Sequence, residues 1–194
     1  MHSSLLLETM KAEDGEILNL PYHQERCDQS RRSLFGTRDT LDLSLLIKPP
    51  QKGLYRCRVI YDTHIRHIEY LPYIPKAIHS LRVVSSALDY SYKYVDRTGF
   101  TMLLEENRDV DEIIIEKEGL LTDTTISNIA FFDGKIWVTP QTPLLYGTMR
   151  AKLLDEGFLT AKNITKEALP GYTQVALMNA MIGFKILDHF NIQT

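Results

Sequence analysis

The stretch LTDTTISNIAFFDGKIWVTPQTPLLYGTMR, residues 121–150, holds two features that could carry chemistry. The first is an acid, Asp123, set among small hydroxyl residues. The second is residues 147–150, Gly-Thr-Met-Arg, where a glycine turn opens directly into the apolar-periodic run AKLLDEGFL. Free amide groups and the positive end of the helix dipole at such a helix start suit a phosphate. Together the two features predict part of a cofactor site.

A third candidate is Lys93, which has tyrosines on both sides in the segment SYKYVDR. A lysine held among aromatic rings can lose its proton more easily, as a nucleophile that forms a Schiff base must. Most lysines are solvated surface groups, however, and the local sequence alone favours that interpretation of Lys93. The residue patterns by themselves therefore predict an anion-binding site whose purpose stays open.

Other polar residues favour structural interpretations. His64 and His67 have the spacing of metal ligands, but on a strand they would point to opposite faces, and no cysteine or carboxylate cluster accompanies them. We therefore expect no metal site. Arg26, Arg31 and Arg32 could form a phosphate or nucleic-acid patch, although a solvated helix face is the default interpretation. The sequence contains no Walker loop, no dinucleotide-binding fingerprint and no nucleophile elbow.

Length and composition are those of a soluble globular protein, with 194 residues, 44% of them hydrophobic and 24% charged. The net charge of −3 gives no overall attraction to nucleic acid or to an anionic membrane. No apolar run approaches the roughly 20 residues that a membrane span needs. The N-terminus becomes acidic too soon for a signal peptide. The two cysteines, Cys27 and Cys57, form no disulfide framework, which favours a reducing cytoplasm.

Residues 1–72 predict a small α+β domain. Two strands surround a turn at Asp14-Gly15, and YHQERCDQSRRSLFG predicts a helix that ends at Gly36. Residues 37–39 are expected to cap a second helix, LDLSLLI. The segments YRCRVIY and HIRHIEYL alternate apolar and polar residues, and they predict a hairpin.

Residues 73–79 are expected to link this domain to a larger C-terminal domain, residues 80–194. Strands are predicted at LRVVSSALDY, DEIIIEKEG and QVALMNA, and a hairpin joins IAFF to IWVTP at Asp133-Gly134. Helices are predicted at GFTMLLEEN, ITKEALPGY and, as an amphipathic end to the chain, MIGFKILDHF. Helices mixed with hairpins favour α+β architecture over a doubly wound parallel sheet.

Taken in order, these motifs resemble the class IV aminotransferase family, the fold-type IV enzymes that use pyridoxal 5′-phosphate (PLP). LLLETMKAEDG resembles the family's Phe-Glu-Thr-Ile strand and turn, and YHQER resembles its His-x-x-Arg helix. Lys93 falls where the family keeps its Schiff-base lysine, and TDTTISNIAFFDGKIWVTP resembles the block that carries the acid. GTMR resembles the Gly-x-x-Arg helix start, and VALMNAMIG the last phosphate strand. The resemblance covers nearly the whole chain and makes catalysis the favoured interpretation of Lys93.

The resemblance implies a two-domain, D-amino-acid aminotransferase-like fold, with an N-terminal α/β sandwich-like domain and a C-terminal β-barrel-like domain that carries the PLP lysine. In this family the active site lies between the two domains and is usually completed by a second subunit. We therefore expect a homodimer that binds PLP and a small-molecule amino substrate, without nucleic acid or membrane partners.

The resemblance also implies roles for single residues. Lys93 would hold PLP and then move a proton as a base. Asp123 would face the pyridine nitrogen and keep it protonated, and Arg26 would clamp the phosphate. The other expected cofactor-binding residues are Gly147, Thr148 and Met149 at the helix start, Asn179 and Ala180 on the other side of the phosphate, and Asn128, which supports the acid-bearing turn. Arg97 is expected either to meet a substrate carboxylate or to form a surface salt bridge.

Two departures from the family pattern bear on these expectations. Asp123 stands where the family more often has glutamate, so a water or a shifted cofactor is expected to fill the gap to the ring nitrogen. The chain begins at the Glu-Thr strand, without the preceding segment that usually supplies a first strand and part of the substrate pocket. The expectations for the cofactor half of the site are therefore better supported than those for the substrate half.

Several functions stay open at this point. The segments LLLETMK, HQER, KYVDR and GTMRAKLL resemble the short lyase-like members, and they favour 4-amino-4-deoxychorismate lyase, which releases pyruvate and 4-aminobenzoate in folate biosynthesis. The alternative is an aminotransferase of a branched-chain or D-amino acid, although the Gly-Gly-Asn-Tyr usual after its lysine is absent. A PLP-binding protein without catalysis and an anion-binding module without a cofactor are the non-enzymatic alternatives.

Overall fold

The computed structural model describes residues 5–194. Residues 1–4 lie outside the described residues. They begin the expected domain over residues 1–72 and the N-terminal segment that is not expected to be a signal peptide. Contacts divide the chain into two compact units. One unit runs to Pro75 and includes Tyr92–Asp96, and the other comprises Lys76–Ser91 and Arg97–Thr194. Among residues 5–194, no helix is long and apolar enough to cross a membrane.

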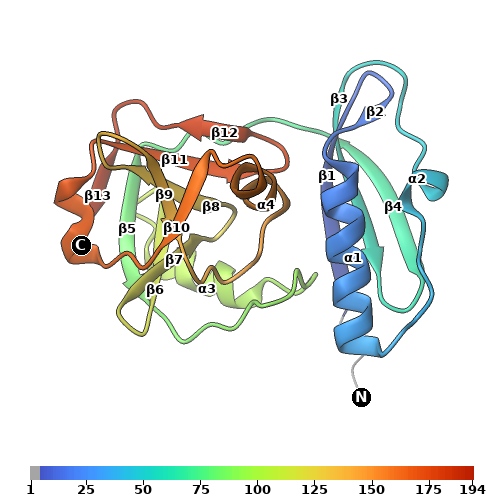
Figure 1. Ribbon diagram of the computed structural model, residues 1–194, viewed down its shortest axis with the longest axis horizontal. Helices are drawn as coiled ribbons and strands as arrows, with labels where there is room; N and C mark the ends of the chain where they lie inside the picture. Colours follow the sequence, from blue (N-terminus) through green and yellow to red (C-terminus); the bar gives the residue numbers. More distant parts are fainter. Residues whose placement is uncertain (1–4) are drawn as a thin grey trace. The chain divides into compact units, whose positions relative to one another are not determined.

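The first unit is a sheet with the strand order β2-β1-β3-β4, and helix α1 lies along one of its faces (Figure 1). Its elements are β1 (Leu6–Glu13), β2 (Glu16–Ile17), α1 (Leu20–Phe35), α2 (Leu43–Leu46), β3 (Leu54–Tyr61) and β4 (Ile65–Pro72). Both predicted hairpins are confirmed, and the β1–β2 turn places Asp14 and Gly15 at positive φ. The predicted end of α1 at Gly36 is also confirmed, since its left-handed backbone lets its N–H cap the Arg32 carbonyl.

Helix α1 and the sheet enclose the core of this unit. Alternate residues of β1 face the helix, so Leu6 and Met10 pack with Cys27 of α1 and with Cys57 of β3. Glu8 lies in the same alternation and is fully buried, although it is ionisable. A buried acid at a core-facing strand position needs partners on the helix.

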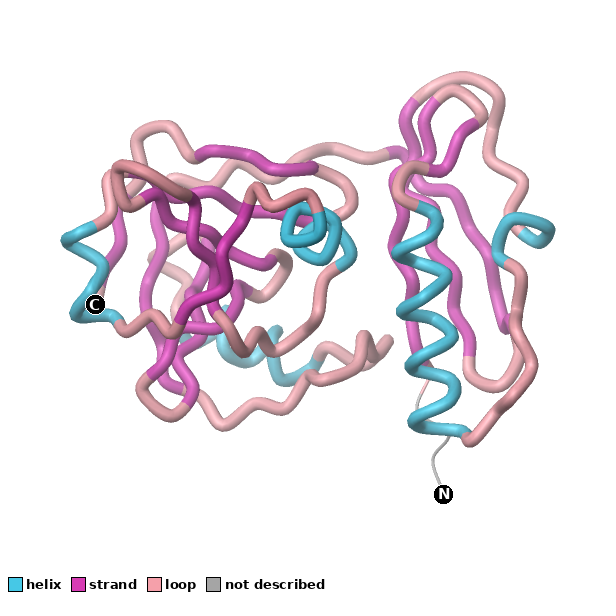
Figure 2. Tube along the Cα trace, viewed as in Figure 1, coloured by secondary structure: helices cyan, strands magenta, loops and turns pink. Residues whose placement is uncertain are grey.

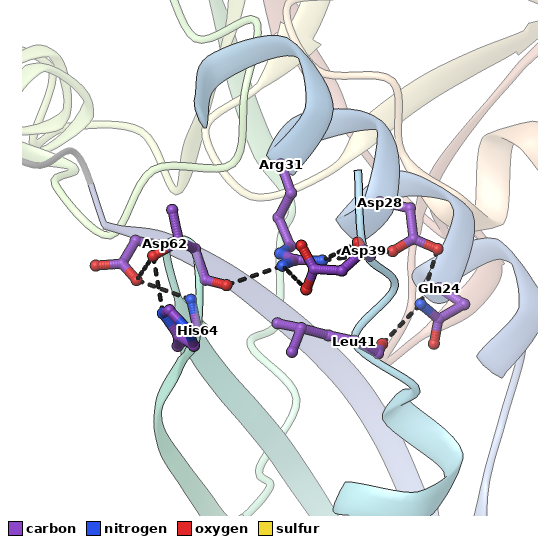
Figure 3. Close-up of polar contacts among 8 residues, drawn as sticks. Gln24, Asp28, Arg31, Asp39, Leu41, Asp62 and His64 are labelled. Carbon is purple, nitrogen blue, oxygen red and sulfur yellow. Dashed lines mark hydrogen bonds and ion pairs between the residues drawn. The ribbon is translucent and has the colours of Figure 1, made fainter. Parts of the chain in front are cut away.

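Arg31 of α1 is also fully buried, which makes the expected solvated helix face wrong for this residue. Figure 3 shows its guanidinium turned toward the loop that follows the helix. Nη1 donates to the Asp39 carbonyl at 2.8 Å, and Nη2 donates to the Asp39 carboxylate at 3.0 Å and to the Thr63 carbonyl at 2.8 Å. Arg31 therefore fastens the loop after α1 and the β3–β4 turn to the helix.

Replacing Arg31 with methionine is expected to lower the free energy of unfolding by about 2–3 kcal/mol, because two backbone carbonyls lose their donors. Urea denaturation of the two proteins measures the difference. Arg32→Met is the matched control, since Arg32 is the exposed neighbour on the same helix and should change stability by less than about 0.5 kcal/mol. An equal loss in both variants would contradict the fastening role of Arg31.

The second unit is built mainly of strands, with α3 and α4 as short helices (Figure 2). Its sheet runs β10-β9-β8-β7-β6-β5-β13, and β11 joins it by pairing with β8 and β12. Side chains from β5 to β9 and from β11 converge on one core around Ile114, Ile129 and Phe131, and the predicted α+β class is confirmed. The bounds are β5 (Ser80–Ser85), α3 (Thr98–Glu106), β6 (Glu112–Lys117), β7 (Leu120–Thr124), β8 (Asn128–Phe132), β9 (Trp137–Pro140), α4 (Thr148–Asp155), β10 (Leu159–Lys162), η1 (Lys166–Gly171), β11 (Gln174–Asn179), β12 (Gly183–Ile186) and β13 (Asn191–Gln193).

One helix prediction is wrong, and a second is confirmed only in part. The helix expected at MIGFKILDHF is replaced by β12, because Gly183 has a left-handed φ of 65° and the residues from Gly183 to Ile186 pair antiparallel with β11. The helix expected over LDLSLLI is reduced to the four residues of α2. Its cap is Asp42, whose carboxylate accepts from the Ser44 N–H at 2.9 Å, and not residues 37–39. Asp39 in that segment binds Arg31 instead.

Candidate active site

Lys93 lies on a short extended segment that pairs with β1. The Leu7 N–H donates to the Lys93 carbonyl at 2.8 Å, and the Val95 N–H donates to the Leu5 carbonyl at 2.9 Å. This pairing explains why Tyr92–Asp96 groups with the first unit, whereas the sequence analysis placed Lys93 in the C-terminal domain. The backbone thus fixes the position of the half-buried Lys93, and the side chains of its two tyrosine neighbours pack against the core of the first unit.

Glu8 binds two side chains of α1 in the interior of the first unit. Its Oε2 lies 2.6 Å from Nδ1 of His23, and Arg26 donates Nε to Oε1 at 2.9 Å and Nη2 to Oε2 at 2.5 Å. This bidentate contact orients the guanidinium of Arg26, the residue expected to bind a phosphate. The name "Glu8 triad" is used below for Glu8, His23 and Arg26.

The pKa values of Glu8 and His23 determine which members of the Glu8 triad are charged. Burial alone would raise the pKa of Glu8, but the charge of Arg26 and the hydrogen bonds from His23 and Arg26 outweigh it and hold the pKa at about 2. Burial lowers the pKa of His23, Glu8 opposes that effect, and the charges of Arg26 and Lys93 lower the pKa further. At neutral pH the triad therefore holds an ionised Glu8, a neutral His23 and a cationic Arg26, with the Lys93 charge near enough to act on His23.

Asp123 lies in the second unit, one residue before the end of β7. Only 4% of the residue is exposed. Its Oδ1 accepts from Nδ2 of Asn128 at 2.7 Å, and its Oδ2 accepts from the Leu145 N–H at 2.9 Å. Burial raises the pKa of Asp123 to about 7, against the opposing effects of the Leu145 and Asn128 hydrogen bonds and the charge of Arg150. The carboxyl is thus buried, held on both oxygens and able to change charge near neutral pH.

This raised pKa predicts a pH dependence of stability. The folded state keeps a proton on Asp123 between pH 4 and 7 that the unfolded chain releases, so stability should fall as pH rises through this window. Between pH 4.5 and 7.5 the apo-protein should lose on the order of 3 kcal/mol relative to Asp123→Asn. Urea denaturation of both proteins across this range measures the effect. Parallel pH profiles would contradict the buried, proton-binding carboxyl.

Helix α4 begins three residues after Leu145, whose N–H binds the Asp123 carboxylate. Gly147 is its N-cap and makes no side-chain hydrogen bond to the first amides of the helix. Arg150 in the first turn is buried, and its Nη2 donates to the Pro140 carbonyl at 2.8 Å, which ties α4 to the end of β9. Met149 packs its side chain against the core around Trp137, so its contribution to a ligand would come from its amide.

The turn after β11 completes this group of residues. Asn179 donates Nδ2 to the Ile126 carbonyl at 3.2 Å and to the Ser127 hydroxyl at 3.0 Å, in the loop that follows Asp123. Its Oδ1 accepts from the N–H groups of Met181 and Ile182 at 2.9 and 3.0 Å. Asn179 therefore shapes the turn that contains Ala180 and connects it to the acid-bearing loop.

The expected site residues thus fall into two groups. Lys93 and Arg26 lie in the first unit, and the second unit contains Asp123, Asn128, Gly147, Thr148, Met149, Asn179 and Ala180. Arg97 also lies in the second unit, where Nη2 donates to the Thr125 carbonyl at 2.6 Å and the guanidinium lies 4.8 Å from the Phe100 ring centre. Its substrate role stays a prediction.

The Glu8 triad was not predicted as a unit from the sequence. A signal was present, because Glu8 alternates with apolar residues of β1 while His23 and Arg26 are three apart and share a helix face. Glu112 was also not predicted; it is fully buried, and its carboxylate accepts from the N–H of Thr125 at 3.2 Å and from the Thr125 hydroxyl at 3.0 Å. Glu112 sits in an apolar strand, and no sequence pattern identifies its partner.

The sequence of the chain matches a known family over most of its length. The sequence model of the amino-transferase class IV family matches residues 5–186. The chain belongs to the class IV aminotransferase family. An uncharacterized protein of Haemophilus influenzae is 37% identical over 184 residues, which cover 92% of this chain and 98% of that protein.

Three proteins that are similar to this chain carry functional names. A Schizosaccharomyces pombe protein named “putative aminodeoxychorismate lyase” is 26% identical over 205 residues, covering 93% of this chain and 87% of that protein. The crystal structure of a “putative 4-amino-4-deoxychorismate lyase” from Haemophilus somnus has a TM-score of 0.86 at 35% identity, and covers 94% of this chain and 99% of that one. The PLP-bound form of a “hypothetical aminotransferase” from Mycobacterium tuberculosis has a TM-score of 0.80 at 16% identity, covering 98% and 82%, which shows the fold alone.

Class IV aminotransferases are PLP-dependent, and the residues of this chain fit that cofactor. The start of α4 has no side-chain cap, and a helix start is a favourable position for an anion. The buried Asp123 carboxyl suits a protonated ring nitrogen, and the cationic guanidinium of Arg26, which Glu8 holds in place, suits a phosphate. A lysine amine, such as that of Lys93, is a group that can bond to the cofactor aldehyde.

Proposed function

We propose that the protein is a PLP-dependent 4-amino-4-deoxychorismate lyase that releases pyruvate and 4-aminobenzoate. The observation that carries this proposal is the similarity to the Haemophilus somnus protein, at 35% identity and a TM-score of 0.86 over 94% of the chain. The Schizosaccharomyces pombe relative with a lyase name supports it at 26% identity. Membership of the class IV family carries the assignment of both groups of residues to one cofactor.

Bound PLP would supply an electron-withdrawing ring that stabilises negative charge on the substrate carbon next to the amino group. Lys93 would take the proton from that carbon and, as an ammonium, return it to the departing pyruvate unit. Arg26, oriented by Glu8, and the amides of Thr148 and Met149 would hold the phosphate. Asp123 would keep a negative charge at the ring nitrogen. Because loss of pyruvate leaves an aromatic ring, the elimination is strongly favourable.

The test is product formation from 4-amino-4-deoxychorismate by the PLP-loaded protein. We expect 4-aminobenzoate and pyruvate in equal amounts. Protein that binds PLP but makes neither product from this substrate would contradict the lyase assignment. If such protein also forms no keto acid from any amino acid, it is a PLP-binding protein without catalysis.

A second candidate function is transfer of an amino group. It is favoured by the structure of a “putative amino-acid aminotransferase” from Mesorhizobium loti, which has a TM-score of 0.80 at 24% identity and covers 95% of this chain. Lys93 would then return the proton to the cofactor rather than to a leaving group. Formation of a keto acid from a branched-chain or D-amino acid, without 4-aminobenzoate from the chorismate substrate, would assign this function.

We also propose that the active form is a cytoplasmic homodimer. Support for the location comes from Cys27 and Cys57, which are free and buried, since burial raises the pKa of both thiols and keeps them unreactive. The dimer is proposed because class IV enzymes usually complete their site with a second subunit. Light scattering during size exclusion should give twice the chain mass, and full activity at the monomer mass would contradict the dimer.

A further inference from the structure

The side chain of Asn128 lies between the Asp123 carboxyl and the start of α4. Its Nδ2 donates to Oδ1 of Asp123 at 2.7 Å and to the Leu145 carbonyl at 2.9 Å. The N–H of Leu145 in turn donates to Oδ2 of Asp123 at 2.9 Å. The N–H of Leu145 is therefore bound by the Asp123 carboxylate and its carbonyl by the Asn128 amide, two residues before the N-cap of α4.

The amide oxygen of Asn128 limits which residue can fit at position 147. A Cβ built on Gly147 would lie 1.9 Å from Oδ1 of Asn128, far inside van der Waals contact. Gly147 has φ −72° and ψ 144°, an extended conformation that any residue adopts. The backbone therefore gives no reason for a glycine here, and the lack of space does.

A glycine also has a cost at this position. The N-cap of a helix favours serine, threonine, aspartate or asparagine, whose side chains accept a bond from the helix amides. Gly147 offers no such bond, and α4 has no side-chain cap. Gly147 therefore lacks a capping contact and leaves room for the Asn128 side chain.

We propose that Asn128 is a positioning residue that joins the Asp123 carboxyl and the start of α4 into one rigid unit, and that Gly147 is a glycine because Asn128 occupies the space of its side chain. This inference rests on the proposed function and deepens it. The ring-nitrogen contact and the phosphate contact are then held at one fixed separation. The site consequently selects a ligand that carries a protonated ring nitrogen and a phosphate at the matching distance.

The first test is a cycle of variants in the full-length apo-protein: Gly147→Ala, Asn128→Ala and the double variant. We expect Gly147→Ala to weaken PLP binding by about 10-fold or more, since overpacking moves Asn128. In the Asn128→Ala background the added methyl finds room, so the same change should cost less than about 2-fold. Gly171→Ala is the matched control, because a Cβ there meets nothing within 4 Å, and its PLP affinity should equal that of the wild type.

Two further readouts separate positioning from a general loss of folding. The absorption band of bound PLP should shift in Asn128→Ala, because the carboxyl at the ring nitrogen loses its hold, while a purely structural role would leave the band in place. Unfolding free energies in urea should show the same non-additivity as the PLP affinities. Additive effects of Gly147→Ala and Asn128→Ala in both measurements would overturn the proposal.

The design also distinguishes this inference from the proposed function. A wild-type protein that binds no PLP removes the proposed function. The rigid-unit claim is then decided by the unfolding free energies, where rescue of Gly147→Ala by Asn128→Ala supports it and additivity overturns it.

Discussion

Replacing Lys93 with alanine is expected to lower the rate of 4-aminobenzoate formation by at least about 10³-fold, even at saturating PLP. Two functions are lost together, since the amine that holds the cofactor and the base that moves the proton are the same group. The backbone at Lys93 is held by hydrogen bonds to β1, which the substitution leaves in place. The fold should therefore survive, and the loss should appear in kcat. Initial rates at several PLP concentrations measure it.

Lys135→Ala is the control for this experiment, because Lys135 is exposed in the turn of the β8–β9 hairpin and belongs to neither group of expected site residues. Its rate should match that of the wild type. Removal of a catalytic base should cost far more than a loss of about 10-fold in rate. If Lys93→Ala kept more than about a tenth of the wild-type activity, Lys93 would therefore not be the catalytic base. The urea denaturation midpoint of Lys93→Ala is measured in parallel. A lowered midpoint would reveal a loss of folding, which is thereby distinguished from a loss of catalysis.

The second large effect is expected from Glu8→Gln. This change leaves Arg26 without its counter-charge in a largely buried position, which should cost about 3–5 kcal/mol of stability at neutral pH. It also releases the guanidinium from the orientation that Glu8 imposes, so affinity for PLP should fall as well. Urea denaturation and fluorescence titration with PLP measure the two losses.

The pH dependence of Glu8→Gln gives a sharper test. The pKa of Glu8 is about 2 in the folded state against an ordinary value of 4.5, so its contribution is present above pH 4.5 and is lost as pH falls toward 2. The wild type should lose on the order of 3 kcal/mol over that range, and Glu8→Gln should lack this loss. Glu13→Gln, at the more exposed end of β1, should change stability by less than about 1 kcal/mol. A wild-type profile that matches Glu8→Gln would contradict a charged triad.

Much of the fold could be predicted because its signals are local. The Asp14-Gly15 turn, the alternation of β3 and β4, and the Gly36 stop of α1 each depend on neighbouring residues, and all are confirmed. The C-terminal segment could not be predicted in this way. MIGFKILDHF has helix-like periodicity, but pairing with β11 and the left-handed Gly183 override it.

The candidate site could also be predicted only where its signals are local. Lys93, Asp123 and the start of α4 could be singled out from residue types and the family resemblance, and their assignment to PLP stays a prediction. The contacts that orient them join residues far apart in sequence. Glu8 meets His23 and Arg26 across the first unit, and Asn128 meets Gly147 through a close approach that no spacing rule encodes. Tertiary packing alone brings these groups together.

The central claim is that Lys93 carries PLP, and reduction with borohydride tests it most directly. Wild-type protein and Lys93→Ala are each incubated with PLP, reduced, digested and analysed by peptide mass. We predict a yellow wild-type protein and a PLP mass increment fixed on the peptide that contains Lys93, with no such increment in the variant. A wild-type protein that stays colourless with added PLP, or equal labelling of other lysines in both proteins, would contradict the account.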